Sequence, residues 1–392
     1  MILLNYLDRV VLSLLSPVIR KEFALSQMEY AMAVNAFLVA YGVMYFGSGI
    51  VLDRLGSRMG LGIFVGLWSL ACALHAAITG LFSLIAYRFV LGLFEPGGWT
   101  GAIKTVAERF TPVQRSLAAG IFTSGAGIGS LIAPPLVIWL SVHYGWRSAF
   151  LISGLAAVIW LPFWFYATRG TTTRTAEITG HRSLHKVVPR ILRNPSALAY
   201  LATRFFGDTT GYFFLFWLPE YLVTSKGFTL IQVGSLAWIP FLWNDLGALL
   251  GGYCSGRIVQ LRSRPLEAKK IMMSMAAIFV LAGSLLQNGS GSIEVLTAVS
   301  LCTFGVGIWA ANMHAVAAEA FHESEVASVH GLAGSVGAVG GILFNTLVGH
   351  FSSQGNYFYA FLVLVTLQPL GVGALWLWMP ERLRDAVADS PA

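Results

Sequence analysis

The sequence predicts an all-α polytopic membrane protein with twelve transmembrane helices in two six-helix halves, and three observations lead to this prediction. The 392 residues are 56% hydrophobic and only 11% charged, with a mean hydropathy of +0.71. A soluble domain carries about a quarter charged residues, so this chain lacks the charge needed to cover a soluble surface. Long apolar runs recur along the whole chain, and one basic stretch divides them six and six.

Twelve runs have the length that a transmembrane helix needs, which is about 20 residues for roughly 30 Å of hydrocarbon. The predicted spans are 1–19, 28–52, 59–79, 81–104, 116–142 and 147–168, then 196–222, 229–254, 271–289, 293–318, 327–351 and 356–379. The loops between them are short. The 42 glycines support tight helix packing, because small residues let transmembrane backbones approach one another.

The basic residues predict the orientation of these helices. Eighteen lysines and arginines fall in the even-numbered loops and the C-terminal segment, whereas the odd-numbered loops hold four, namely Arg20, Lys21, Arg147 and Lys226. The positive-inside rule then places the even loops and both termini in the cytoplasm. The net charge of +7 is therefore a topology signal, and no nucleic-acid partner is expected.

The longest polar stretch lies between the sixth and seventh spans. It holds six bases and one acid. We therefore expect an N-terminal six-helix half over 1–168, a basic cytoplasmic linker over 169–195 and a C-terminal six-helix half over 196–392.

A charged turn joins the second and third spans and reads Gly49-Ile-Val-Leu-Asp53-Arg54-Leu-Gly56-Ser-Arg58. Its glycines permit a tight turn, and Asp53 can cap a neighbouring helix end and pair with a base there. The segment resembles the loop signature of the major facilitator transporters, Gly-x-x-x-Asp-Arg-x-Gly-x-Arg/Lys. The resemblance implies the major facilitator fold, a substrate site between the halves near mid-membrane, and a cytoplasmic gate formed by Gly49, Asp53, Arg54, Gly56 and Arg58.

Ionisable residues inside the spans are costly unless they are paired or face water. The spans contain Asp8, Arg9, Arg88, Glu95, Arg204, Asp208 and Asp245. Arg88 and Glu95 are seven residues apart and share one helix face, whereas the adjacent Asp8 and Arg9 point about 100° apart. These four predict a site for an anion and a proton, with structural ion pairing as the alternative. Arg204 is expected to snorkel, and the roles of Asp208 and Asp245 stay open.

Two pairs of these residues, Asp8 with Arg9 and Arg88 with Glu95, lie within longer motifs. Asn5-Tyr6-Leu-Asp8-Arg9 resembles the first-helix element Asn-Tyr-x-Asp-Arg of the anion:cation symporter family within the major facilitators, and Arg88-Phe-Val-Leu-Gly92-Leu-Phe-Glu95 resembles its fourth-helix element. Segments 124–135, 214–219, 239–247 and 331–341 extend the similarity, the last three toward the hexuronate transporter branch. The resemblance implies proton-coupled symport of a small organic anion, most often a sugar acid such as a hexuronate or aldonate.

The resemblance also implies roles for individual residues. Asp8 and Glu95 would carry protons, Arg9 would meet the substrate carboxylate, and Arg88 would tune Glu95. Further substrate-binding candidates are Tyr6 and Tyr41, whose hydroxyls would face the sugar, and from the second half Trp217, Asn312 and Ser335. Where some aldonate carriers have glutamine in the fifth span, this chain has Gly125 or Ala126, which leaves a hexuronate or another small acid open.

The expected partners are the small organic anion, protons and the lipid bilayer of the inner (plasma) membrane, and we expect a monomer. No metal or other cofactor is expected, because the three cysteines, Cys72, Cys254 and Cys302, lie far apart without a CxxC spacing. A major facilitator exporter or antiporter of another metabolite or drug is the first alternative. A polytopic membrane enzyme is the second, although the sequence has no complete GxGxxG, no GxSxG, no GKS/T loop and no HExxH.

The first span is short on its N-terminal side. Seven residues precede Asp8, which is about 10 Å of helix, whereas half of the hydrocarbon core is about 15 Å. The sequence-based expectation is that this chain starts late relative to its relatives.

Overall fold

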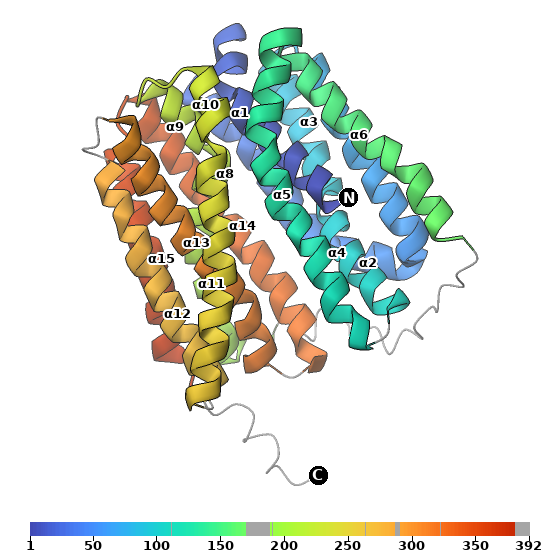
Figure 1. Cartoon of the computed structure of the whole chain (residues 1–392), viewed down its shortest axis with the longest axis vertical. Coiled ribbons are helices and arrows are strands. Elements are labelled where there is room, and N and C mark those ends of the chain that lie inside the picture. The colour runs from blue at the N-terminus through green and yellow to red at the C-terminus, as the bar shows by residue number, and fades with distance from the viewer. Residues whose placement is uncertain are drawn as a thin grey trace. The chain divides into compact units, whose positions relative to one another are not determined.

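The computed structural model describes residues 1–110, 112–169, 189, 191–262, 264–286, 291–321 and 323–380. Every regular element in these ranges is a helix, and the elements are labelled in Figure 1. The prediction of an all-α protein is confirmed. Within the same ranges, nine helical segments are long and apolar enough to cross a membrane, and each of the twelve predicted spans coincides with helix.

The first half of the chain forms six α-helices and one short 3-10 helix in the described part. They are α1 (Ile2–Glu22), α2 (Gln27–Leu74), η1 (His75–Ala77), α3 (Leu81–Phe94), α4 (Pro96–Arg109), α5 (Pro112–Tyr144) and α6 (Trp146–Ala167). The predicted spans 28–52 and 59–79 both lie in α2, which is broken at Gly56 with φ 71° and ψ 162°. This conformation is essentially restricted to glycine, so the predicted tight turn is confirmed.

The predicted fourth span is divided into α3 and α4. Glu95 lies between the two helices, as the C-cap of α3 and the N-cap of α4, and Pro96 is the first residue of α4. Proline suits the first position of a helix and not its interior, because it has no backbone N–H to donate. The division places the Glu95 carboxylate at a helix junction in the middle of the predicted span.

The described residues of the second half form eight α-helices and one 3-10 helix. They are α8 (Pro195–Phe216), α9 (Leu218–Thr224), α10 (Leu230–Leu236), α11 (Trp238–Arg262), α12 (Pro265–Val280), η2 (Leu281–Leu286), α13 (Ser292–Ala320), α14 (Glu323–Ser353) and α15 (Phe358–Trp378). The predicted seventh span is divided at Trp217, and Pro219 is the second residue of the next helix. Similarly, Ala237 separates α10 from α11.

The helices form two compact units. Unit 1 contains Met1–Gly180, Leu215–Trp238 and Ile342–Gly355, and unit 2 contains His181–Phe214, Ile239–Gly341 and Asn356–Ala392. Unit 1 thus includes two short segments of the second half. Most of the predicted linker (169–195) lies outside the described residues, and the division at 168 and 196 stays a prediction.

In unit 1, α1 packs against α5, α6 and α9, while α2 packs against α3, α4 and α6. The contact between α2 and α3 is close at Gly92, where a Cβ atom would collide with the carbonyl oxygen of Phe37. Glycine therefore lets the two backbones meet. Because Arg88 lies one helical turn from Gly92, this contact brings the α3 site residues against α2.

Candidate functional site

The centre of unit 1 contains a buried ion pair between α1 and the α3–α4 junction. Nε of Arg9 donates to Oε1 of Glu95, and the two residues are 9% and 1% exposed. Cζ of Arg9 lies 5.0 Å from the ring centroid of Tyr6 and 4.9 Å from that of Tyr41. Nη2 of Arg9 also donates to the Tyr41 hydroxyl at 3.4 Å. The structure therefore brings together four predicted site residues from three helices.

Arg88 is buried beside this group but does not form the ion pair with Glu95. It is 1% exposed, and its guanidinium lies 4.6 Å from the centroid of the Phe37 ring. Among the described residues, no acceptor forms a hydrogen bond with its three nitrogens. It acts on Glu95 and Arg9 through charge alone. Seven-residue spacing placed Arg88 and Glu95 on one face, yet the carboxylate bonds to the base on α1.

Asp8 is buried in a different environment from its neighbour Arg9. Its side chain is 1% exposed and faces Trp68 and Cys72 of α2 and Ser153 of α6. These are neutral groups, and no base of the described chain pairs with this carboxylate. Adjacent residues on a helix point about 100° apart, so Asp8 and Arg9 act in two directions, as the sequence predicted.

The three second-half candidates, Trp217, Asn312 and Ser335, have side-chain hydrogen bonds within their own units. Trp217 lies in unit 1, is fully buried, and donates from Nε1 to Oδ1 of Asn345 at 2.7 Å. Asn312 and Ser335 lie in unit 2, where their side chains donate to the carbonyls of Ile308 at 2.9 Å and Gly331 at 3.3 Å. A substrate-binding role for these three residues stays a prediction.

The predicted cytoplasmic gate lies around the break in α2. The side chain of Asp53 falls outside the described residues, while Arg54 is exposed and Arg58 is half-buried. Cζ of Arg58 lies 5.9 Å from the centroid of the Phe165 ring, and its carbonyl accepts from Nε1 of Trp164 at 2.9 Å. Both contacts hold the turn against α6, and the gating role of Gly49, Asp53, Arg54, Gly56 and Arg58 stays a prediction.

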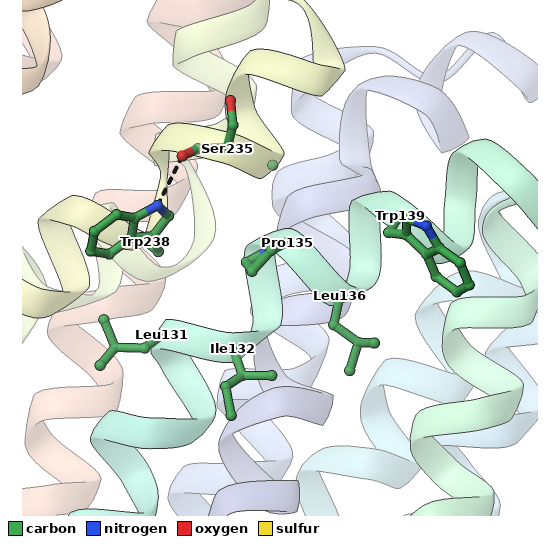
Figure 2. Close-up of a pocket in the computed structure, with 8 residues that line it drawn as sticks. Leu131, Ile132, Pro135, Leu136, Trp139, Ser235 and Trp238 are labelled. Carbon is green, nitrogen blue, oxygen red and sulfur yellow. Dashed lines mark hydrogen bonds between the residues drawn. The ribbon is translucent and has the colours of Figure 1, made fainter.

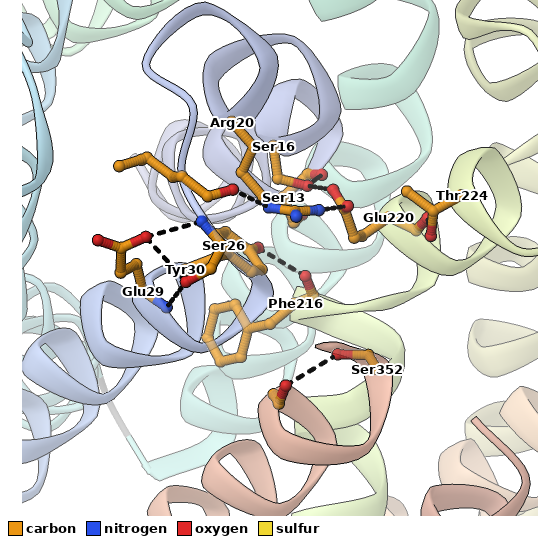
Figure 3. Close-up of polar contacts among 12 residues, drawn as sticks. Ser13, Ser16, Arg20, Ser26, Glu29, Tyr30, Phe216, Glu220, Thr224 and Ser352 are labelled. Carbon is orange, nitrogen blue, oxygen red and sulfur yellow. Dashed lines mark hydrogen bonds and ion pairs between the residues drawn. The ribbon is translucent and has the colours of Figure 1, made fainter. Parts of the chain in front are cut away.

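Unit 1 contains a second buried ion pair that sequence reasoning missed. Arg20, near the end of α1, donates to the fully buried carboxylate of Glu220 on α9, and Ser16 donates to the same carboxylate at 2.8 Å. The Tyr30 hydroxyl donates to the carbonyl of Phe216 at 2.7 Å. Figure 3 shows these contacts. We call Ser16, Arg20, Tyr30, Phe216 and Glu220 the Glu220 seam, because it joins first-half helices to a second-half segment.

The signal for the Glu220 seam was present in the sequence. Glu220 is an acid inside the predicted span 196–222, directly after Pro219, and such a residue needs a partner. Arg20 was counted only as a loop base. Its partner stands 200 positions away, a distance over which spacing rules carry no information.

One cavity of unit 1 has the wrong chemistry for an anion. It has a volume of about 740 Å³ and lies between α5 and the α10–α11 junction (Figure 2). Its wall is made by Leu131, Ile132, Pro135, Leu136, Trp139, Gly234, Ser235 and Trp238. The Trp238 indole already donates to the Ser235 carbonyl at 2.8 Å. None of these lining residues is charged, so this cavity offers no ionic partner to an anion, whereas the Arg9 group contains a buried guanidinium.

Comparison with known proteins agrees with the geometry. The model of the Major Facilitator Superfamily matches residues 1–345. The chain is 30% identical to the hexuronate transporter of Escherichia coli (strain K12), over 98% of this chain and 93% of that protein. It is 29% identical to the galacturonate transporter of Dickeya chrysanthemi, over 75% of this chain and 88% of that protein.

A solved structure has the same fold. The bacterial homologue of the human lysosomal transporter Spinster, in an inward-facing and occupied conformation, superposes with a TM-score of 0.78. The match covers 98% of this chain and 96% of that chain at 15% identity. The predicted major facilitator fold is confirmed.

Proposed function

Because the chain belongs to the Major Facilitator Superfamily and spans the membrane, we propose that it is a secondary active transporter that carries a small organic anion together with protons. The observation that supports this proposal best is the Arg9–Glu95 ion pair, buried between the rings of Tyr6 and Tyr41. A base that is already paired with an acid can exchange that acid for an external carboxylate. Such an exchange couples the anion to a proton.

The coupling follows from competition for one guanidinium. Arginine binds a carboxylate through a planar fork of two N–H groups. While Glu95 is ionised it occupies Arg9, and a substrate carboxylate would enter against its negative charge. Protonation of Glu95 removes that charge and frees the fork of Arg9 for the substrate. When the proton leaves on the other side of the membrane, Glu95 reclaims Arg9 and the anion is released.

Asp8 and Arg88 support this exchange from either side of the Arg9 group. Asp8 lies among neutral donors on the far face of α1, so it is the second proton carrier and does not compete directly for Arg9. Arg88 keeps a positive charge next to Glu95 without bonding to it. It therefore makes the electrostatic potential at the site more positive, which favours the entry of an anion.

The proposed substrate is a sugar acid, most specifically a hexuronate. The curated relatives include a hexuronate transporter and a galacturonate transporter, and the Tyr41 hydroxyl lies beside the guanidinium that would hold the carboxylate. Tyr6 and Tyr41 offer hydroxyls to the polyol and ring faces to its C–H groups. Gly125 and Ala126 leave no side-chain amide in the fifth span for an aldonate chain.

The proposed location is the inner (plasma) membrane of a bacterium, as a monomer with both termini in the cytoplasm. The basic even-numbered loops support this orientation. With transporters among its relatives, we propose that the chain is not an enzyme and needs no cofactor.

Uptake by the purified protein in proteoliposomes tests the proposal. A panel of glucuronate, galacturonate, galactonate and galactarate is offered with and without an inward proton gradient. We expect accumulation of a hexuronate that depends on the gradient and stops when a protonophore collapses it. Uptake that is unaffected by the gradient, or expulsion of the acid against it, would favour the alternative of an exporter or antiporter.

A further inference from the structure

Unit 2 contains a second group of ionisable side chains that the proposed mechanism does not use. It comprises Tyr200, Arg204 and Asp208 of α8, His314 of α13 and His330 of α14. Nε of Arg204 lies 2.7 Å from Oδ2 of Asp208, and the two side chains are 8% and 19% exposed. The sequence-based expectation that Arg204 snorkels is therefore wrong, because its guanidinium is buried against an acid on the next turn.

The two histidines meet this pair from neighbouring helices. The His314 and His330 ring centroids are 5.3 Å apart, and Nδ1 of His330 lies 2.9 Å from the Tyr200 hydroxyl. The charge of Arg204 interacts with both imidazoles, and the charge of Asp208 interacts with His314. Of the charged residues of α12, the buried Lys270 bonds to the carbonyl of Met379, and Glu267 forms ion pairs with Arg262 and Arg264. The five residues therefore form one electrostatic group.

Two members of this group, His314 and Asp208, can take up a proton. Nδ1 of His314 donates to the Ala310 carbonyl at 2.6 Å, so Nε2 is the nitrogen that accepts a proton. The His314 side chain is exposed, although it lies in a helix that spans the membrane. On α14, a Cβ atom at Gly337 would lie 2.6 Å from Oδ2 of Asp208, so this glycine leaves space for the carboxylate.

The Arg204–Asp208 pair resembles the Arg9–Glu95 pair of the first half. Arg204 stands on the first helix of the second half, as Arg9 stands on the first helix of the chain, and each is paired with one carboxylate. With Asp208 ionised and both imidazoles neutral the group has no net charge, and an entering anion meets the charge of Asp208. One added proton makes the group a net cation, which an anion would stabilise.

We propose that Tyr200, Arg204, Asp208, His314 and His330 form a second, proton-linked binding site for a carboxylate. A proton on Asp208 or on Nε2 of His314 weakens the hold of Asp208 on Arg204. The freed guanidinium then binds the carboxylate, and the His314 imidazole is a second donor when its Nε2 carries the proton. Anion and proton therefore enter and leave this site together. The ligand, a sugar-acid carboxylate, rests on the proposed function, whereas the existence of the site does not.

Binding of galacturonate to the purified full-length chain tests the linkage, measured by calorimetry at pH 5.5 and pH 8. We make the comparison in a Glu95→Gln background, so that the first-half acid no longer titrates. Asp208→Asn removes the competitor for Arg204, and we expect it to tighten binding at pH 8 by about tenfold, a coupling of ordinary size, and to flatten the pH dependence. Arg204→Gln should weaken binding at both pH values.

Asp245→Asn is the matched control. Asp245 is also a partly buried aspartate of the second half, but it lies on α11 beside Asn244, and its replacement should change neither affinity nor pH dependence. If Asp208→Asn weakens binding equally at both pH values, or leaves it unchanged, Asp208 has only a structural role and the proposal is overturned.

A second measurement uses the unaltered protein and does not depend on the folding of a variant. Diethyl pyrocarbonate modifies exposed imidazoles, and mass spectrometry reports the rate at His314. We expect galacturonate to slow this rate severalfold at pH 6 and to leave the exposed His350 unaffected. If galacturonate is not transported but succinate protects His314, the proposed substrate is wrong and the carboxylate site stands. If neither acid protects His314, the site itself is refuted.

Discussion

The carboxylate of Glu220 is fully buried against the guanidinium of Arg20, although the two residues stand 200 positions apart in the sequence. Arg20 belongs to α1 and Glu220 to α9, so the pair connects the two sequence halves at the end of α1. Ser16 supplies a further hydrogen bond to the same carboxylate. Movement of the halves apart at this end would have to break all of these bonds.

The first prediction concerns this connection. Glu220→Gln removes the carboxylate charge and so weakens the bonds from Arg20 and Ser16, and a hydrogen bond to a charged group contributes about 1.5–3 kcal/mol. We therefore expect the variant to populate more often a conformation that is open at the end where Arg20 and Glu220 lie. The reporter is Ser13→Cys, on the buried face of α1 in Figure 3, in a chain whose exposed Cys254 is serine. A membrane-impermeant maleimide should label it at least tenfold faster in the Glu220→Gln variant.

Glu22→Gln is the matched control for that measurement. Glu22 forms an ion pair with Arg147 at 2.9 Å and accepts from the indole of Trp146, but all three residues belong to the first half. Loss of this pair should leave the labelling rate of the reporter unchanged. Equal acceleration by both variants would mean that the Glu220 seam has no specific role in holding this end closed.

The second prediction concerns the coupled proton. Glu95→Gln keeps the shape of the side chain but cannot release a proton, and it no longer competes for Arg9. We expect accumulation driven by a pH gradient to be abolished while counterflow exchange of labelled substrate continues. Asp8→Asn should also lose accumulation. Accumulation at the parent level in both variants would remove these acids from the coupling step.

The third prediction separates the two arginines of the site. Arg9→Lys keeps the charge but loses the planar fork and its stacking on Tyr6 and Tyr41. Substrate binding should weaken by about 1.5–3 kcal/mol. Arg88 makes no bond to Glu95, so Arg88→Lys should shift the pH profile of transport more than the affinity. Binding measured for each variant from pH 5 to 8 distinguishes these roles, and the reverse pattern would exchange them.

The fourth prediction concerns the break in α2. Gly56 has φ 71° and ψ 162°, where a Cβ atom costs about 1–3 kcal/mol. Gly56→Ala should lower the thermal midpoint of the purified protein. Gly256→Ala is the control, because that glycine is helical and has open space around its Cβ position. This control should be neutral or slightly stabilising, and an equal loss in both variants would contradict the explanation.

Much of the architecture was predictable because it depends on local sequence. Apolar runs of about 20 residues produce helices in a bilayer whatever they pack against, and the described residues of each predicted span lie mainly in helix. The break at Gly56 follows from a conformation that only glycine adopts readily. Similarly, Asp8 and Arg9 had to point in two directions, since their separation around the helix is set by its geometry.

The sequence by itself therefore determined the helices and the family, and it placed Asp8, Arg9, Arg88 and Glu95 inside the spans. It did not determine which of these residues pair, and it missed Glu220. Spacing places Arg88 and Glu95 on one face of one segment, yet the partner of Glu95 is Arg9, because the approach of α1 to the α3–α4 junction decides which base reaches the carboxylate. The same holds for Arg20 with Glu220 and for His314 with His330. Such contacts join residues whose separation in sequence carries no periodic signal, and the rotation and packing of whole helices bring them together.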